Sequence, residues 1–220
     1  MFVTLAIFDL DGTLISGDSD HTWGQFLIEK GIVDAQVYQK KNDQFYQKYM
    51  AGSLDIHEYL TFSLAPLTHF SLPELMQLHD EFMVLKIVPL IQNKAIELVE
   101  EHRKKDHFTM IITATNEFIT APIARLFGVD YLIAPIPELK NNRYTGKVTG
   151  VPSFQEGKVT RLNSWLKETG NDLKGSYFYS DSHNDLPLLE LVDHPIVVDA
   201  DDKLTFIAKE KDWSIISLRD

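Results

Sequence analysis

Short apolar runs alternate with amphipathic segments along most of this chain. The run VTLAIF at residues 3–8 is rich in β-branched and aromatic side chains, and FTMIIT at residues 108–113 has the same character. Runs of this length predict strands that are buried on both faces. Because segments of helical periodicity follow them, the pattern predicts an α/β protein with a parallel sheet that is covered on both faces.

The second half of the chain continues this alternation. Helices are expected over residues 116–128, 154–170, 182–192 and 201–211. Strands are expected over residues 130–134, 175–180, 195–200 and 213–217. Pro122 should kink its helix or lie near the first turn. Residues 138–150 alternate around Asn141-Asn142, which predicts a hairpin.

The first two strands are almost a hundred residues apart, although a βαβ unit takes only about 30. A helix at residues 93–106 accounts for the crossover and leaves residues 15–88 as excess. Helical patterns fill this excess at residues 21–31, 34–50, 55–67 and 71–86, with Gly and Pro between them. We therefore expect an all-α cap at residues 15–88, with its own core, inserted into a catalytic core of residues 1–14 and 89–220.

Composition and charge narrow the class of protein. The chain has 44% hydrophobic and 24% charged residues, a net charge of -11 and no cysteine. This charge would repel nucleic acid and anionic membrane surfaces, and the lack of cysteine excludes disulfides and thiolate metal sites. There is neither a signal-peptide pattern nor an apolar run of about 20 residues. We expect a cytoplasmic protein whose partner is a small molecule.

Polar side chains stand where the predicted strands end. Asp9 and Asp11 follow the first strand, and Thr113 ends the second. Asp181 and Asp185 follow a later strand. Because ligands bind outside the carboxyl ends of parallel strands, we expect these side chains to meet at one edge of the sheet.

Such a cluster of carboxylates has an electrostatic consequence. Two like charges about 4 Å apart cost about 4 kcal/mol at an effective dielectric constant of 20, so the carboxylates should raise one another's pKa or bind a cation. Mg²⁺ typically uses one or two carboxylates together with water and substrate phosphate. Lys158, near the start of its helix, could neutralise a further substrate oxygen. The cluster therefore predicts a Mg²⁺ site and a phosphoryl substrate.

The residue types suggest roles in phosphoryl transfer. Asp9 can attack phosphorus and form an acyl-phosphate, while Asp11 can protonate the leaving alcohol and then activate water. Gly12 allows the backbone to approach phosphate. Thr113 can donate to a phosphoryl oxygen, and Lys158 can stabilise charge in the transition state.

Each residue alone also has an ordinary structural interpretation. An Asp at a strand end is usually a turn or N-cap residue, and a Lys on a helix is usually solvated. The combination of these residues favours the functional interpretation: DLDGT at residues 9–13 occurs together with Thr113, Lys158 and DSHND at residues 181–185. Asp181 and Asp185 are then expected to hold the metal or to orient Lys158.

These segments resemble the four motifs of the haloacid dehalogenase superfamily. The matching stretches are FDLDGTL (8–14), IITAT (111–115), the region around Lys158, and SDSHNDLPLL (180–189). The position of the insert resembles the C1 cap of the phosphoserine-phosphatase-like branch, subfamily IB, as does the hairpin RYTGKVTG (143–150). The resemblance implies a Rossmann-like core with a helical cap closing over the site.

The resemblance also implies functional roles. Asp9 would be the nucleophile and Asp11 the general acid and base. Mg²⁺ would be held by Asp9, the backbone carbonyl of Asp11, and Asp181, with Asp185 in support. The other motif residues expected to contact substrate are Gly12, Thr13, Ala114 and Asn184.

The substrate is less closely defined by the motifs. Phosphoserine phosphatases usually carry Glu nine residues after the nucleophile, where this chain has Asp18, and they use a cap arginine that residues 15–88 lack. The run GDSDHTWGQFL (17–27) is similar to a bacterial subgroup often labelled histidinol-phosphatase-like. We expect histidinol phosphate or another amino-alcohol phosphate, with phosphoserine as the alternative.

Two interpretations of the start of this run remain open. In one, Asp20 caps a helix and Trp23 anchors its core face. In the other, Asp18 and His21 lie between cap and core and contact the leaving group, where an acidic contact would favour an amine.

Other functions compete with a phosphatase. A phosphotransferase of the same fold would pass the phosphoryl group to another alcohol. A non-catalytic phosphoryl-accepting domain would need neither Asp11 nor a cap. A binding protein without activity would have no need of the intact set of Asp9, Asp11, Lys158 and Asp181.

Overall fold

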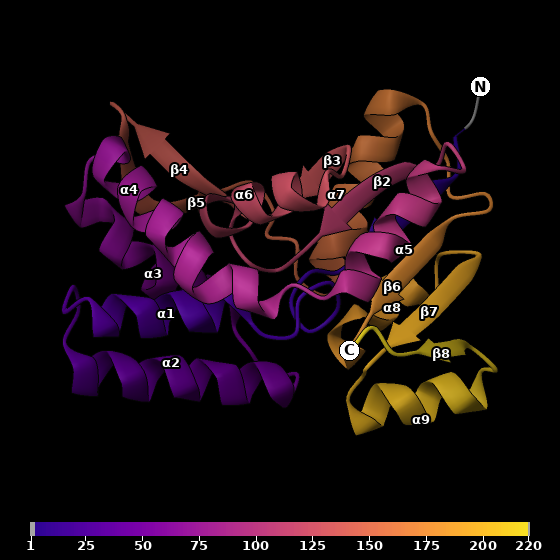
Figure 1. Ribbon diagram of the computed structural model, residues 1–220, viewed down its shortest axis with the longest axis horizontal. Coiled ribbons are helices and arrows are strands. Elements are labelled where there is room, and N and C mark those ends of the chain that lie inside the picture. Colours follow the sequence, from indigo (N-terminus) through magenta and orange to yellow (C-terminus); the bar gives the residue numbers. More distant parts are fainter. Residues whose placement is uncertain (1–2, 220) are drawn as a thin grey trace.

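A six-stranded parallel sheet forms the centre of one half of the molecule in the computed structural model, which describes residues 3–219 (Figure 1). The strand order is β3–β2–β1–β6–β7–β8, so β1 lies between β2 and β6. The strands are β1 (Leu5–Phe8), β2 (Phe108–Ile112), β3 (Tyr131–Ile133), β6 (Tyr177–Ser180), β7 (His194–Val198) and β8 (Ser214–Ile216). The predicted parallel sheet is confirmed.

Helices cover both faces of this sheet, as the sequence predicts. They are α5 (Asn93–Arg103) and α6 (Glu117–Phe127) on one face, and α7 (Glu156–Thr169), α8 (Leu186–Leu189) and α9 (Asp202–Glu210) on the other. Side chains of β1 alternate between the two layers: Ala6 and Phe8 pack with α5 and α6, whereas Leu5 and Ile7 pack with the other three helices. This period of two is the property of a strand buried on both faces. The Rossmann-like core is therefore confirmed.

The inserted segment is helical. Its helices are α1 (Ser19–Glu29), α2 (Ala35–Met50), α3 (Ile56–Leu64) and α4 (Leu72–Phe82), followed by a π-helical turn, η2 (Met83–Ile87), and a 3₁₀ turn, η3 (Val88–Leu90). The third expected helix ends earlier than its pattern predicts, because Pro66 lies in the first turn of a separate 3₁₀ helix, η1 (Ala65–His69). No helix among the described residues is long and apolar enough to cross a membrane.

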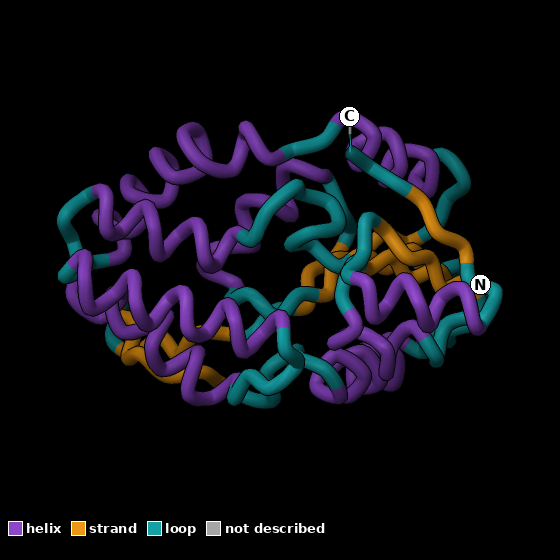
Figure 2. Tube along the Cα trace, turned by 90° about the horizontal axis from the view of Figure 1, so that it is seen from below, coloured by secondary structure: helices purple, strands orange, loops and turns teal. Residues whose placement is uncertain are grey.

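The predicted hairpin is present and lies away from the main sheet. Its strands are β4 (Ile136–Lys140) and β5 (Arg143–Thr149). Asn141 and Asn142 both have positive φ, at 51° and 58°, which suits a tight hairpin turn. The hairpin packs against α3 and η1, so it accompanies the helical segment in space (Figures 1 and 2).

The apolar interior of the insert is continuous with that of the catalytic core. Trp23 of α1 and Phe82 of α4 belong to the same buried apolar cluster as Phe8 of β1 and Ile123 of α6. His79 of α4 strengthens the junction, because its Nε2 lies 3.0 Å from a backbone carbonyl of α6. The apolar stripes of α1 and α4 are therefore buried against the core helices as well as against each other.

A proline and the helix caps account for smaller differences from the predicted boundaries. Pro122 is the sixth residue of α6, inside the helix and not in its first turn. Asn116 caps that helix and Gly128, at φ 65°, ends it in the left-handed conformation. The helix expected at residues 182–192 is shorter, because a 3₁₀ turn, η4 (His183–Asp185), precedes α8.

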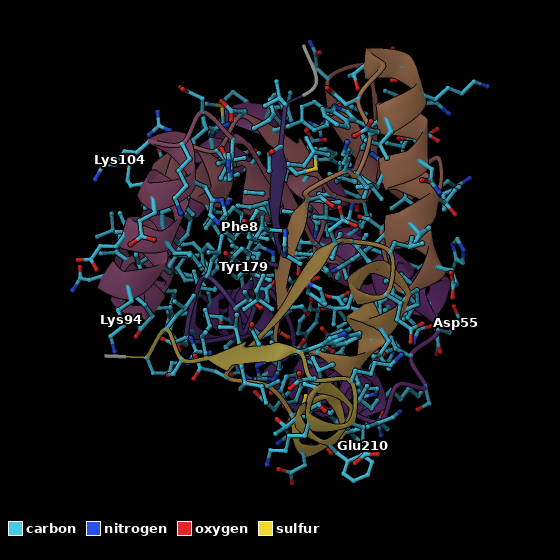
Figure 3. The ribbon with its side chains drawn as sticks, turned by 90° about the vertical axis from the view of Figure 1, so that its right-hand side faces the viewer. Phe8, Asp55, Lys94, Lys104, Tyr179 and Glu210 are labelled. Atoms are coloured by element: carbon cyan, nitrogen blue, oxygen red, sulfur yellow. The ribbon has the colours of Figure 1, made fainter. Side chains whose placement is uncertain are left out.

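A row of aromatic and histidine side chains lies between α5 and the sheet, joined by stacking and hydrogen bonds. Phe8 and Tyr179 stack at 5.0 Å between ring centroids, on neighbouring strands and on the α5 side of the sheet (Figure 3). His102 Nε2 lies 2.8 Å from the Tyr179 hydroxyl, and His102 Nδ1 lies 2.8 Å from Nδ1 of His107. Burial, with smaller contributions from the charges of His107 and Lys105, lowers the pKa of His102 to about 4.

We expect His102→Gln to weaken the acid dependence of stability. Between pH 6.5 and 4 the unfolded chain binds a proton at this position and the folded chain does not, so stability is lost as pH falls through that range. The variant should be about 1–3 kcal/mol less stable at pH 7.5, because it loses buried hydrogen bonds. Urea unfolding at pH 7.5 and at pH 5 should show that the unfolding free energy of His102→Gln falls less between these pH values than that of the wild type. The control is His57→Gln, on the exposed surface of α3. If the unfolding free energy of His102→Gln fell between pH 7.5 and 5 by as much as that of the wild type, the proposed effect of His102 would be wrong.

Candidate active site

The carboxylates meet at the strand ends because of the strand order. Asp9 follows β1, and its amide donates to the carbonyl of Tyr179 in β6 at 2.9 Å. Asp181 directly follows β6, and Thr113 follows β2 on the other side of β1. The predicted convergence of these three strand ends is therefore present in the structure.

Lys158 joins two of the motifs. Its Nζ lies 2.6 Å from Oδ1 of Asp9 and 2.8 Å from a carboxylate oxygen of Asp185, and the side chain is only 3% exposed. Ser180 Oγ donates to Asp185 at 2.7 Å and holds that carboxylate in place. Burial opposes the charge of Lys158, but Asp185 and Asp9 outweigh it and raise the pKa of the ammonium. Lys158 is a buried, fixed cation.

One lysine does not neutralise this cluster. Burial raises the pKa of Asp9 well above its ordinary value; Lys158 counteracts this, and the charges of Asp185 and Asp181 add to it. A hard divalent cation with oxygen ligands would relieve the excess charge, so the donor set fits Mg²⁺. Within residues 3–219, no three His, Asp or Glu side chains form a ready-made metal cluster. A fit therefore requires water, phosphate or backbone oxygens in addition to two carboxylates.

The loop after Asp11 is fitted closely to Asp181. Gly12 has φ 76°, and a Cβ at this residue would lie 2.1 Å from Oδ2 of Asp181. Thr13 Oγ1 donates to Asp181 Oδ1 at 3.0 Å and accepts from the Asp181 amide at 3.0 Å. Burial and the charge of Asp185 raise the pKa of Asp181 to about 7, although Thr13 partly offsets this. Glycine is required here by both backbone conformation and space.

Asp11 is held by groups that the sequence analysis did not identify. Its Oδ1 accepts from the Ser19 amide at 2.6 Å, and its Oδ2 accepts from Thr115 Oγ1 at 2.9 Å. Thr113 Oγ1 is farther away, at 3.4 Å. Burial raises the pKa of Asp11, and the hydrogen bonds from Ser19 and Thr115 lower it in part. A carboxyl with a raised pKa is suited to proton transfer near neutral pH.

A cavity opens beside these groups, between the sheet and the insert. The core side is formed by Asp9, Asp11 and the segment Thr113–Thr115, which includes Ala114. The insert side carries acidic and aromatic side chains, including Asp18, Asp20, His21, Tyr46, Tyr49 and Tyr59. Among the described residues, the lining contains no lysine or arginine.

The start of α1 combines a helix cap with part of the cavity lining. Asp18 is the N-cap, and its carboxylate accepts from the His21 amide at 2.8 Å. The expectation that Asp20 caps the helix is wrong, because the helix begins at Ser19 and Asp20 lies inside it. Asp18 and His21 both line the cavity. Burial and the charge of Asp11 raise the pKa of Asp18 to about 6.

Other expected contact residues are occupied by protein partners. Asn184 Nδ2 donates to the carbonyl of Tyr49 in α2 at 3.0 Å, and its Oδ1 accepts from Gln155 at 2.9 Å. Asn184 is not part of the cavity lining, so the structure places it as a link between the fourth motif and the insert. His21 Nε2 lies 3.1 Å from Oδ1 of Asp43.

Arg219 supports the first motif from the other end of the chain. Its Nη2 donates to the carbonyl of Gly12, and its own carbonyl accepts from Lys94 of α5, which is labelled in Figure 3. No motif includes Arg219, so the sequence carried no signal for this contact. Ser19, Thr115 and Arg219 were all missed because only the folded chain brings them to Asp11 and Gly12.

Fold and site together define a class of hydrolases, in which aspartates at the strand ends of a parallel sheet work beside a buried lysine. The chain belongs to the haloacid dehalogenase-like hydrolase family, which it matches over residues 6–190. It is a phosphatase, a hydrolase of phosphoric monoesters.

Its relatives are similar over nearly the whole length. A Neisseria meningitidis serogroup C (strain 8013) protein named histidinol-phosphatase is 48% identical over 219 residues, which cover 98% of this chain and 99% of that one. A crystal structure of a Bordetella pertussis Tohama I protein of unknown function is 43% identical, with a TM-score of 0.93, and covers 99% of this chain and 100% of that one. A substrate-bound phosphoserine phosphatase, 17% identical, has a TM-score of 0.71 and covers 100% of this chain and 94% of that one. At this identity the likeness is one of fold.

We expect Gly12→Ala to disable the site without unfolding the protein. The new Cβ would displace Asp181, and a misplacement of about 1 Å costs about 100-fold in rate. Phosphate release should fall by that factor, and added Mg²⁺ should no longer raise the melting temperature. Gly31→Ala is the matched control, because Gly31 also has positive φ, at 66°, but a Cβ added there would have no atom within 4 Å. Equal losses in both variants would contradict this account.

Proposed function

We propose that this protein is a Mg²⁺-dependent phosphatase that acts through an aspartyl-phosphate on a small amino-alcohol phosphate such as histidinol phosphate. One observation carries the mechanism: Asp9 is fixed by Lys158, while Asp11, held separately by Ser19 and Thr115, lines the same cavity. Two carboxylates with different neighbours can take two different roles.

In the first step, a carboxylate oxygen of Asp9 forms a bond to phosphorus as the bond from phosphorus to the alcohol oxygen breaks. Asp11 acts as the general acid and gives a proton to the leaving oxygen, a role that its raised pKa favours. In the second step, ionised Asp11 takes a proton from water, whose oxygen attacks phosphorus and releases phosphate. Asp9 is then regenerated as a carboxylate, which Lys158 stabilises.

The carboxylates of Asp9 and Asp181 and the carbonyl of Asp11 would hold Mg²⁺. When bound, the ion neutralises charge on the phosphoryl oxygens. Asp185 supports this arrangement through Lys158, because its carboxylate binds Lys158 and Ser180. Thr13 keeps Asp181 in position.

The substrate class follows from the charge of the cavity and from the relative named histidinol-phosphatase. The lining includes four aspartates, and the cap segment 15–88 has no arginine. Among the described residues, the lining offers the carboxylate of phosphoserine no lysine or arginine, whereas its acidic groups Asp18 and Asp20 would attract an alcohol carrying only cationic nitrogens. This difference favours an amino-alcohol phosphate over phosphoserine.

The substrate assignment is tested with a panel of phosphomonoesters in Mg²⁺ buffer. We expect kcat/KM for histidinol phosphate to exceed that for phosphoserine by at least about 100-fold, because a buried charge that is left unpaired or repelled costs several kcal/mol. Phenyl phosphate serves as a neutral comparison, and phosphate release is the measurement. A preference for phosphoserine would contradict the assignment.

The covalent mechanism is tested with Asp9→Asn. Removing the nucleophile should lower kcat by at least about 10⁴-fold, and acid-quenched reactions should no longer trap protein-bound phosphate. Asp172→Asn, in an exposed loop, is the control and should behave as wild type. Circular dichroism verifies folding of both variants. If Asp9→Asn kept more than about a tenth of the wild-type kcat, the mechanism would be wrong.

A further inference from the structure

Asp20 is a buried acid without a protein partner. Its side chain lines the cavity, the residue is only 5% exposed, and neither carboxylate oxygen has a hydrogen-bond partner among the described residues. Native proteins pair nearly all buried polar atoms, because an unpaired one costs free energy. An unpaired carboxylate that faces a cavity therefore points to a ligand that supplies the missing donor.

The helix itself gives no reason for this carboxylate. Asp18 already caps α1, and the Ser19 amide is bound to Asp11. Asp20 is the second residue of the helix, where a negative charge gains only about 0.3–1 kcal/mol from the helix dipole. Burial of an unpaired carboxylate costs more than this gain. The presence of a buried, unpaired carboxylate at Asp20 is therefore better explained by ligand binding than by a contribution to helix stability.

The surroundings of Asp20 suit a cation. Burial and the charge of Asp18 raise the pKa of Asp20 well above its ordinary value, and the Tyr59 hydroxyl of α3 offsets this only in part. A cation bound beside Asp20 would favour its ionised form. Phe45 and Tyr59 form an aromatic pair in the same lining, with ring centroids 5.2 Å apart. Aromatic rings beside a carboxylate form a favourable environment for an ammonium or imidazolium group.

The acidic groups also define a direction across the cavity. Asp11 lies at the strand end, Asp18 and Asp20 lie at the start of α1, and Tyr59 of α3 lies in the same cavity lining. A leaving alcohol that begins at Asp11 would therefore extend along α1 toward α3. We propose that the Asp20 carboxylate binds a cationic nitrogen of the leaving alcohol and so determines substrate specificity. This inference rests on the proposed function, because it requires a phosphomonoester bound with its phosphoryl group at Asp9.

The test compares Asp20→Asn with wild type on histidinol phosphate and phenyl phosphate. The ratio of the two kcat/KM values should fall about 100-fold, since removing one partner of a buried charge pair has an effect of this size. The loss should lie mainly in KM for histidinol phosphate. Free histidinol should become a weaker inhibitor by a similar factor, whereas inhibition by inorganic phosphate should stay within about threefold. A purely structural defect would weaken both inhibitors.

Matched variants separate charge recognition from folding. Asp34→Asn removes the N-cap carboxylate of α2, outside the cavity lining, and should keep the wild-type ratio. Asp20→Glu keeps the charge and should recover part of the preference. If Asp20→Asn does not fold, Asp20→Ser replaces it, with the same expected fall in the ratio because it also removes the charge.

The outcomes are distinct. If wild type shows no preference for histidinol phosphate over phenyl phosphate, the proposed substrate class fails, and this inference fails with it. If wild type shows the preference and Asp20→Asn keeps the ratio within about threefold, only the inference fails. If Asp20→Asn does not fold, a ratio within about threefold of wild type in Asp20→Ser overturns it. A deaminated analogue of histidinol phosphate identifies the nitrogen: loss of the Asp20 effect assigns the amine, and retention assigns the imidazole.

Discussion

The ion pair that Lys158 makes with Asp9 and Asp185 is the interaction on which the site depends. It ties together residues that are 149 and 27 positions apart in the chain. Breaking a buried pair of this kind leaves an uncompensated charge and typically costs about 3–5 kcal/mol. The carboxyl ends of β1 and β6 and the start of α7 are therefore fixed relative to one another.

The remaining carboxylates differ because their neighbours differ. Asp181 is pressed against Gly12 and bound by Thr13, so it faces the same region as Asp9. Asp11 is bound from two sides by Ser19 and Thr115, one from the insert and one from the core. Because Ser19 is the first residue of α1, the position of the insert is coupled directly to the carboxylate of Asp11, the proposed general acid.

The parallel sheet, its order of elements and the cluster at Asp9, Asp181 and Lys158 could be predicted from the sequence, because apolar runs and motif spacing are local properties. The roles of Asp18 and Asp20 could not. Asp18 and Asp20 are both residue types that commonly cap helices, so the sequence does not distinguish them. The contact of the Ser19 amide with Asp11 determines which of the two is the N-cap. Arg219 was equally hidden, since its contact with Gly12 spans 207 positions.

The shared apolar cluster has a consequence for how the molecule unfolds. Trp23 and Phe82 pack in the same cluster as Phe8 and Ile123, so the apolar interior of the helical segment continues into the sheet layer. Separating them would expose large aromatic side chains on both sides at once. We therefore expect the two halves to unfold as one cooperative unit, in a single transition.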